Sequence, residues 1–302
     1  MRTPRFAFAA VAAATALVLA ACGGDEDGGD EAGGDTTDAP TEEAPEFEAG
    51  TTMAELNEAS SVTIGTKFDQ PLFGLVGPDG VPVGFDVEIG KIIAAELGID
   101  EENIEWVETI SANREAFIEE GQVDFVVATY TINDERKQVV DFAGPYYVAG
   151  QTIMVLEGNT DINGPDDLAG KKVCSAEGST PAERIRTEYP EAELVPAGAY
   201  SECLEPLRNG QVDAVTTDNV ILSGFVDQNP GEFKLVESEP FSEEPYGIGL
   251  ERCDDDFRTF VNDVLEESFE DGRWADAWEA TAGAVLETPA PPAVDRYEAT
   301  GC

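Results

Sequence analysis

Short apolar runs alternate with amphipathic stretches along most of the chain. Runs rich in β-branched and aromatic residues predict buried strands, because they lack the alternation of a strand with one solvated face. The predicted strands are residues 61–65, 104–107, 123–127, 151–156, 172–175, 214–217 and 246–250. Between the strands, apolar residues recur at helical spacing; Ile89, Ile93 and Leu97, for example, form one stripe. Strands that alternate with helices predict an α/β fold.

The sequence Gly-Gln-Val-Asp occurs twice, at residues 121–124 and 210–213, each time between a helical segment and a buried strand. The first strand ends in hydroxyl residues followed by Arg136, whereas the second ends in Asp218. In open α/β sheets, ligands bind where strands end and helices begin. Two lobes facing each other across a cleft, one with a cation and hydroxyls and the other with a carboxylate, would form a receptor for a free amino acid.

Arg136 has two interpretations. Thr129 and Thr131 stand at the end of the preceding strand, and a guanidinium group five residues beyond a threonine hydroxyl suits a carboxylate ligand. Alternatively, Arg136 pairs on the surface with one of the acids that flank it, which are Asp134, Glu135 and Asp141. The repeated sequence in a matching context favours the ligand site.

Residues 1–21 have the features of a secretory signal. Arg2 and Arg5 precede an apolar segment that is too short for a settled transmembrane helix. The segment runs into Leu-Ala-Ala-Cys at residues 19–22, which resembles a bacterial lipobox. That resemblance implies cleavage before Cys22 and attachment of lipid, palmitate included, so that the mature protein is anchored to the membrane. The alternative is an ordinary signal peptide that is cut nearby.

The segment from residue 22 to residue 50 is predicted to be an acidic, disordered tether. From Gly23 to Gly50 the chain has eleven aspartates and glutamates, no lysine or arginine, and one aromatic residue, Phe47. Such a segment buries too little apolar surface to offset the conformational entropy of the chain. Repulsion between its charges would extend it and hold the globular part away from the membrane.

The composition excludes several classes of function. The formal net charge is −46, from 63 acidic and 17 basic residues, which argues against nucleic acid or anionic lipid as a partner. Histidine is absent, which excludes histidine triads and histidine-ligated metal sites. No metal and no cofactor are therefore expected.

The cysteines predict two disulfides. With Cys22 assigned to lipid, four cysteines remain in an exported domain, where disulfides persist. Cys174 and Cys203 fall in one predicted lobe, while Cys253 and Cys302 follow the return to the other, and we predict that they pair in this way. The two other pairings stay open at this point, and neither predicted pair has metal-ligand spacing.

Three longer motifs carry a family resemblance that extends from Ser61 to about Gly283. They are GFDVEIGKIIAAELG at residues 84–98, ANREAFIEEGQVDFVVATYTINDERKQVVDFAGPYY at 112–147 and GQVDAVTTDNVILSG at 210–224. The chain resembles the extracytoplasmic solute-binding proteins (family 3) of polar-amino-acid ABC importers, and most of all the glutamate-binding lipoproteins of Gram-positive bacteria. The resemblance implies a two-lobed, periplasmic-binding-protein-like clamshell of type II with two hinge crossover strands. The expected lobes are residues 51–149 with 246–302, and residues 150–245.

The resemblance also implies how the backbone of an amino-acid ligand is held. Arg136, with Thr131 and Thr129, would grip the α-carboxylate, and Asp218 would receive the α-ammonium. Ser179 and Thr180 would reach the α-carboxylate from the other lobe when the lobes close. Helix capping alone could also explain Ser179 and Thr180, because Thr180 as N-cap, with Pro181 and Glu183 after it, forms a capping-box pattern.

For acidic substrates, the resemblance implies that Lys67, Ser111 and Arg114 hold the side-chain carboxylate. Lys67 keeps the charge of the arginine expected in some relatives but lacks its bidentate fork, so glutamate and aspartate both remain open. Arg114 falls in the first turn of a predicted helix, where the helix dipole disfavours a cation, and this suggests another use for it. Ser111 could instead cap that helix.

These features predict extracytoplasmic binding of L-glutamate, with aspartate or glutamine as alternatives, and delivery to the permease subunits of an ABC importer. Glutamate carries two carboxylates and one ammonium, which Lys67 with Arg114, then Arg136, and then Asp218 would match in a dry cleft. The protein is expected to be a monomer anchored through Cys22. The competing functions are an amino-acid-sensing receptor domain and a clamshell enzyme such as a dehydratase. The sequence shows no nucleophile–base pair of the kind that an enzyme would use.

Overall fold

The computed structural model describes residues 45–298 and Cys302. The predicted signal sequence, the predicted lipid-attachment residue Cys22 and most of the predicted tether lie outside the described residues. The described part includes the end of the tether, where Phe47 packs edge-to-face against Phe260 with ring centroids 5.6 Å apart. Phe47 of the predicted tether therefore packs against the hydrophobic core.

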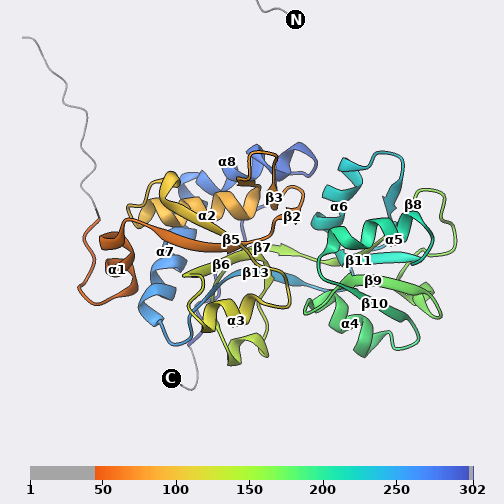
Figure 1. Ribbon diagram of the computed structural model, residues 1–302, viewed down its shortest axis with the longest axis horizontal. Coiled ribbons are helices and arrows are strands. Elements are labelled where there is room, and N and C mark those ends of the chain that lie inside the picture. Colours follow the sequence, from red (N-terminus) through yellow and green to blue (C-terminus); the bar gives the residue numbers. More distant parts are fainter. Residues whose placement is uncertain (1–44, 299–301) are drawn as a thin grey trace, which may run out of the picture. The chain divides into compact units, whose positions relative to one another are not determined.

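A five-stranded sheet forms the centre of lobe 1 (Figure 1). Its strands, in spatial order, are β5 (Ile104–Glu108), β1 (Val62–Thr66), β6 (Phe125–Thr131), β13 (Glu244–Leu250) and β7 (Asp141–Ala149). The first three are parallel, and β13 runs antiparallel between β6 and β7. The side chains of β6 enter two separate core clusters, with Phe125 and Val127 in one and Val126, Ala128 and Tyr130 in the other. Both faces of the strand are buried, as its continuous apolar run predicts.

Helices cover both faces of this sheet (Figure 1). α2 (Phe85–Glu96) packs with α7 (Asp255–Asp271) and α8 (Arg273–Ala280), and α3 (Arg114–Glu119) packs on the opposite face. The remaining elements of lobe 1 are α1 (Thr52–Ala59), η1 (Glu101–Asn103), η2 (Arg136–Gln138), η5 (Ala282–Ala284) and a small sheet of β2 (Asp69–Gln70), β3 (Gly74–Val76) and β4 (Pro82–Val83).

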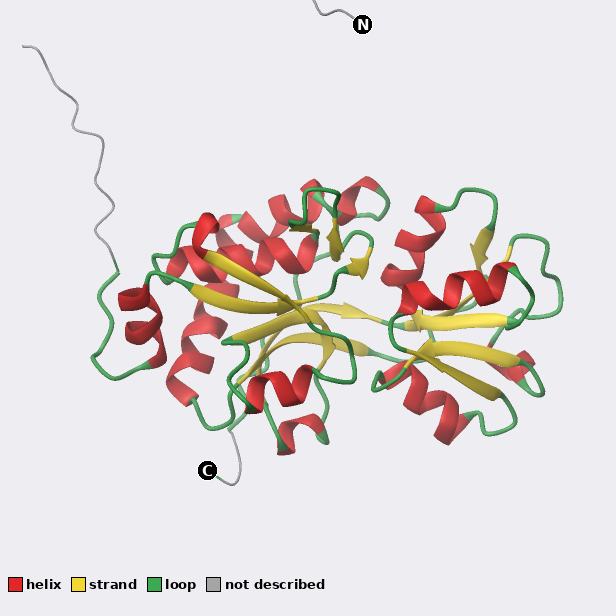
Figure 2. Cartoon of the chain, viewed as in Figure 1, coloured by secondary structure: helices red, strands yellow, loops and turns green. Residues whose placement is uncertain are grey.

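A second five-stranded sheet forms the centre of lobe 2, again between helices (Figure 2). Its strands, in spatial order, are β10 (Glu193–Ala197), β9 (Lys172–Ala176), β11 (Ala214–Asp218), β8 (Gln151–Leu156) and β12 (Phe233–Leu235). Its helical elements are η3 (Pro165–Leu168), α4 (Thr180–Glu188), η4 (Tyr200–Cys203), α5 (Leu204–Arg208) and α6 (Asn219–Gln228). β10, β9 and β11 are parallel, whereas β8 is antiparallel to both of its neighbours.

Two connections join the lobes. β7 ends at Ala149 in the first sheet and β8 begins at Gln151 in the second, while β13 starts at Glu244 and returns the chain to the first sheet. The predicted two-lobed α/β fold with crossover strands is confirmed. Within the part of the chain that the structure describes, no helix is long and apolar enough to cross a membrane.

The repeated Gly-Gln-Val-Asp sequence has the same local structure in both lobes. Its glycine follows a helix with a φ angle of 63° in the first copy and 64° in the second, which glycine adopts without strain. Asp124 then exchanges two hydrogen bonds with the backbone of Thr63, at 2.8 and 2.7 Å. Asp213 makes the equivalent pair with Lys172, both at 2.8 Å. Each copy therefore fastens the start of one strand to its parallel neighbour, which sets where the polar strand ends lie.

Both predicted disulfides are confirmed. Cys174 of β9 is bonded to Cys203 at the end of η4, and Cys253 is bonded to Cys302. The first pair is buried in lobe 2. The second ties the end of the chain to the loop before α7, where the backbone N–H of Cys253 donates to Asp141 Oδ2 at 2.8 Å.

The segment after α8 returns to the edge strand β7. The Tyr297 hydroxyl accepts a hydrogen bond from the Phe142 N–H at 2.8 Å and donates to Asp141 Oδ1 at 3.2 Å. Lys137 Nζ and the Arg258 guanidinium lie over the Tyr297 ring, 3.9 and 4.5 Å from its centroid. This C-terminal segment therefore packs beside the turn that carries Arg136.

Candidate functional site

The nine residues predicted to contact a ligand come together where the two lobes meet. Eight of them are buried, the most exposed being Arg136 at 7%, and Thr180 is half-buried. Seven of the nine line one small cavity together with three further residues. The lining residues are Ser111, Arg114, Thr129, Thr131, Ser179, Thr180, Pro181, Tyr200, Asp218 and Ile221. Lys67 and Arg136 hydrogen-bond to members of this set.

Arg136 is held at the end of β6 by contacts with both lobes. The Asn133 side chain accepts a hydrogen bond from the Arg136 N–H at 2.8 Å, which starts the η2 turn. The guanidinium donates to the carbonyl oxygens of Thr131 at 2.6 Å and of Gly178, in lobe 2, at 3.1 Å. Its Nε lies 3.4 Å from Glu115 Oε1. Because the side chain is buried and pairs with Glu115, the alternative of a surface pair with a flanking acid is wrong.

Lys67 and Arg114 form a second cationic group. Lys67 Nζ donates to Ser111 Oγ at 3.0 Å, and Arg114 Nη1 donates to the Ala128 carbonyl at 2.9 Å. The Arg114 guanidinium lies 4.0 Å from the centroid of the Tyr130 ring. Burial lowers the pKa of Lys67 well below its usual value, and the charge of Arg114 acts in the same direction. Arg114 Nε is buried and has no hydrogen-bond partner among the described residues. An anion would satisfy both groups.

Asp218 supplies a carboxylate at the end of β11. The Tyr246 hydroxyl donates to its Oδ2 at 2.6 Å, whereas its buried Oδ1 finds no partner within the described part of the chain. Burial raises the pKa of Asp218 to about 7, and the charge of Glu244 adds to this. A cation in the cavity would satisfy Oδ1 and lower that pKa.

Both helix caps predicted near the site are wrong. The N-cap of α3 is Asn113, and the Ser111 hydroxyl instead accepts from Lys67. The N-cap of α4 is Ser179, one residue earlier than predicted, because its backbone is extended and its hydroxyl accepts from the Ala182 N–H at 3.1 Å. This leaves the Thr180 hydroxyl to donate to Glu244, a buried acid that sequence reasoning missed, at 2.7 Å.

Thr129 has a backbone conformation that the sequence does not predict. Its φ angle is 44°, in the left-handed region that β-branched residues rarely adopt. The Asp86 carboxylate holds it by accepting the Thr129 N–H at 2.8 Å and the Tyr146 hydroxyl at 2.6 Å. Gln70 accepts the Thr129 hydroxyl at 2.9 Å. Asp86 is fully buried in the otherwise apolar face of α2. An acidic residue among the apolar positions of that face is the feature of the sequence that could have indicated its role.

The lobes touch each other around the cavity. The backbone N–H of Ser201, in lobe 2, donates to Asp69 Oδ2 of lobe 1 at 3.2 Å. Gly178 approaches lobe 1 so closely that a Cβ atom on it would lie 2.8 Å from the Ala112 Cα. The two lobes are therefore closed on each other, and a side chain larger than hydrogen at position 178 would clash with the backbone of lobe 1.

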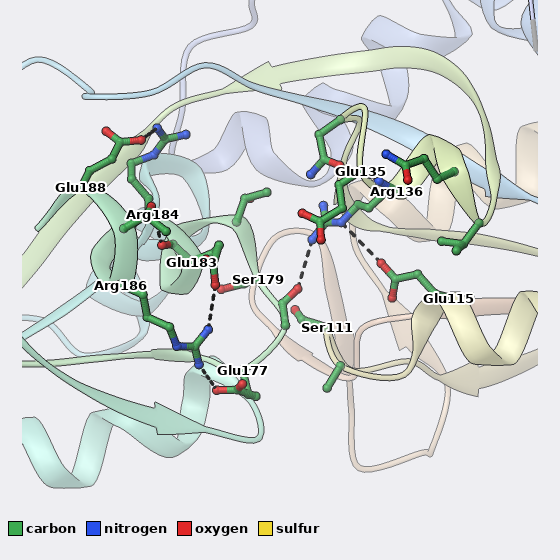
Figure 3. A pocket seen from close by; sticks show the side chains of 17 residues that line it. Ser111, Glu115, Glu135, Arg136, Glu177, Ser179, Glu183, Arg184, Arg186 and Glu188 are labelled. Carbon is green, nitrogen blue, oxygen red and sulfur yellow. Dashed lines mark hydrogen bonds and ion pairs between the residues drawn. The ribbon is translucent and has the colours of Figure 1, made fainter. Parts of the chain in front are cut away.

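A larger, open cleft, lined in part by Arg136, adjoins the buried cavity and shares Ser111, Ser179 and Thr180 with it. Figure 3 shows glutamates and arginines from both lobes around this cleft. Several are paired with each other; Arg186, for example, lies 2.6 Å from Glu177 and 3.1 Å from Glu183. Such exposed pairs contribute little energy, so the strongly interacting groups are those of the buried cavity.

The buried set offers two cationic groups, one carboxylate and several hydroxyls within a closed space. That chemistry fits a small zwitterion with an additional negative charge, because each buried charge then finds a counterpart. Among residues 45–298 and Cys302, no cluster of three acidic or cysteine side chains could hold a metal ion.

Comparisons with known proteins identify relatives whose names describe amino-acid-binding proteins. Residues 62–280 match the family described as bacterial extracellular solute-binding proteins, family 3. The chain is 42% identical to the glutamate-binding protein GluB of Corynebacterium efficiens, over 74% of this chain and 80% of that one. It is 37% identical to the glutamine-binding protein GlnH of an ABC transporter in Bacillus subtilis, over 74% and 81%. An ancestral arginine-binding protein bound to glutamine superposes with a TM-score of 0.69 at 35% identity, covering 74% of this chain and 97% of the other.

Proposed function

Because the chain belongs to family 3 of the bacterial extracellular solute-binding proteins, we propose that it binds L-glutamate and delivers it to the permease of an ABC importer. One observation carries this proposal. Arg114 Nε and Asp218 Oδ1, on facing lobes, are buried and lack partners among the described residues. Unpaired buried groups are costly, so a ligand that brings both an anion and a cation into the closed site is strongly favoured.

The common part of the amino acid lies between the lobes in this proposal. Arg136 and the Thr131 hydroxyl bind the α-carboxylate from lobe 1. Ser179 and Thr180 approach it from the N-terminus of α4, where the helix dipole favours an anion. Asp218 accepts the α-ammonium through its second oxygen.

Lys67, Ser111 and Arg114 then bind the side-chain carboxylate, while Thr129 completes the wall of the cavity. Two buried cations beside each other are stabilised by a full negative charge more than by a neutral amide. This difference supports glutamate over glutamine. Aspartate carries the same charges on a side chain that is shorter by one methylene, so it is the second ligand to compare with glutamate.

Calorimetric titration of the purified protein with L-glutamate, L-glutamine and L-aspartate tests the proposal. We expect glutamate to bind at least tenfold more tightly than the other two. Replacing Arg114→Gln removes a charge-assisted hydrogen bond, which amounts to a loss of roughly 10- to 100-fold for glutamate. Affinity for glutamine should change much less, and this ligand is the internal control. Preference for glutamine in the unmodified protein would contradict the acidic-substrate proposal.

Closure of the lobes should depend on Gly178. Replacing Gly178→Ala adds a Cβ atom 2.8 Å from Ala112, so we expect glutamate affinity to fall at least tenfold. Gly170→Ala is the matched control, since Gly170 has a similar φ of 73° in the same lobe but no atom near its Cβ position. Both variants should lose stability to backbone strain, measured by urea unfolding. Equal loss of affinity in the two variants would mean that strain, and not closure, is responsible.

We propose that the protein is a receptor and not an enzyme, so it should return glutamate unchanged after prolonged incubation, as chromatography of the ligand would reveal.

We also propose that the protein is a monomer outside the cytoplasm, tethered to the membrane by lipid on Cys22. Metabolic labelling with radioactive palmitate should mark the unmodified chain and not the Cys22→Ala variant.

A further inference from the structure

A short turn of lobe 2 contacts both the ligand cavity and the opposite lobe. This turn, η4, comprises Tyr200–Cys203. Tyr200 is 4% exposed and lines the cavity beside Asp218. The next residue, Ser201, makes the backbone hydrogen bond to Asp69 of lobe 1. A displacement of η4 would therefore alter the cavity wall and a contact between the lobes together.

The turn has little stability of its own. It is a single stretch of 3₁₀-helix, in which hydrogen-bond geometry is poor, and the bond from Glu202 N–H to the Ala199 carbonyl is long at 3.3 Å. Its last residue, Cys203, is bonded to Cys174 of β9. Both half-cystines are buried, at 0% and 1% exposed. The disulfide therefore fastens the turn to the central part of the second sheet.

We propose that the Cys174–Cys203 disulfide is a positioning element of the ligand site. By fixing η4 on β9, it holds Tyr200 in the cavity wall and presents the Ser201 N–H to Asp69 when the lobes close. This inference rests on the proposed function, because it concerns the same site. It assigns to the bond a role in retaining the ligand, in addition to any contribution to folding.

The contact between Ser201 and Asp69 joins the two lobes, so it exists in the closed arrangement and is lost when they separate. Loss of the disulfide should then accelerate dissociation of the ligand and leave association nearly unchanged, since the ligand enters before closure. A purely structural role would lower stability without this kinetic asymmetry. The two outcomes can be separated by experiment.

The chain supplies a matched control in its second disulfide, Cys253–Cys302, which lies in the other lobe. In stopped-flow measurements, the Cys174→Ser/Cys203→Ser variant should release L-glutamate at least tenfold faster, with its association rate within twofold of the unmodified protein. The Cys253→Ser/Cys302→Ser variant should release it at the original rate. Equal acceleration in both variants, or in neither, would overturn the proposal.

Two single variants test the contact while leaving the disulfide intact. Asp69→Ala removes the acceptor of the Ser201 N–H and should accelerate release. Asp69→Asn removes the same charge but keeps an acceptor oxygen, and it should release glutamate more slowly than Asp69→Ala does. In the variant without Cys174 and Cys203, Asp69→Ala should add little further effect, because the contact is already lost. Additive effects would contradict a common mechanism.

A measurement without ligand distinguishes failure of this inference from failure of the proposed function. Hydrogen exchange of the Leu204 amide, which donates to the Ser201 carbonyl within lobe 2 whether or not the lobes are closed, should be slow in the unmodified protein, fast without Cys174–Cys203 and slow again in the Cys253–Cys302 control variant. Slow exchange without Cys174–Cys203 would refute the positioning role whatever the protein binds. Absence of glutamate binding together with the expected exchange pattern would refute only the proposed substrate.

Discussion

Replacing Arg136→Gln should weaken binding of glutamate, glutamine and aspartate alike, by roughly 30-fold to several thousand-fold. The guanidinium is buried, donates to carbonyl oxygens of both lobes and is proposed to grip the α-carboxylate that all three ligands share. Removing one partner of a buried, hydrogen-bonded charge pair costs about 2–5 kcal/mol, which corresponds to that range. Calorimetry with the three amino acids measures the loss.

Arg186→Gln is the matched control for this variant. Arg186 lines the adjoining open cleft, but its side chain is 39% exposed and pairs with Glu177 and Glu183. Affinity should stay within about twofold, because an exposed ion pair contributes little. A selective loss of glutamate binding in Arg136→Gln, with glutamine unaffected, would mean that Arg136 contacts the side-chain carboxylate and that the proposed orientation of the ligand is reversed.

Replacing Asp218→Asn should lower glutamate affinity by about 100-fold near pH 8, since an amide is a far weaker partner for an ammonium than a carboxylate is. The variant keeps the shape of the side chain and an acceptor for the Tyr246 hydroxyl. Asp213→Asn, at the start of the same strand, is the control, because Asp213 is exposed and bonds to the backbone of Lys172. It should bind glutamate normally.

The same residue should make binding depend on pH. Burial raises the pKa of Asp218 to about 7, with Glu244 acting in the same direction and Arg114 and Arg136 opposing it. The bound ammonium stabilises the ionised form, so the complex keeps Asp218 charged to a lower pH than the ligand-free protein does. Affinity should therefore be constant well above pH 7 and fall below it by up to about tenfold per pH unit.

Titration from pH 8 to pH 5.5 measures this dependence, and Asp218→Asn should abolish it. Asp86 is the group that could be confused with Asp218, because burial raises its pKa to about 7 as well. Asp86 is still present in Asp218→Asn. A pH dependence that persists in this variant would assign the titration to Asp86 and the Thr129 backbone that it supports.

Much of the fold follows from local patterns in the sequence. The apolar run that begins β6, residues 125–128, is buried on both faces, as a run without polar side chains predicts. The repeated Asp124 and Asp213 bond to the start of the neighbouring strand in each lobe, so the repeat predicts two similar halves. The polar residues that follow each strand are then brought to the same edge of the sheet, and this places Arg136 and Asp218 at the meeting point of the lobes.

Other features depend on contacts that no local pattern encodes. The left-handed backbone of Thr129 is imposed by the side chains of Asp86 and Gln70, which come from elements far away in sequence. Glu244 becomes part of the site because Ser179 occupies the N-cap position, which leaves the Thr180 hydroxyl free to donate a hydrogen bond to Glu244. Competition between two adjacent hydroxyl residues for one cap is decided by backbone geometry, which the sequence alone leaves open.

The C-terminal segment determines where a shortened version of the protein can end. The family match stops at residue 280, which makes that position an inviting end for an expressed fragment. Such a fragment would lose Tyr297, whose ring packs against Lys137, the immediate neighbour of Arg136. It would also leave Cys253 without Cys302, and an unpaired thiol in an oxidising medium forms covalent dimers. Fragments intended for binding studies should therefore extend to Cys302.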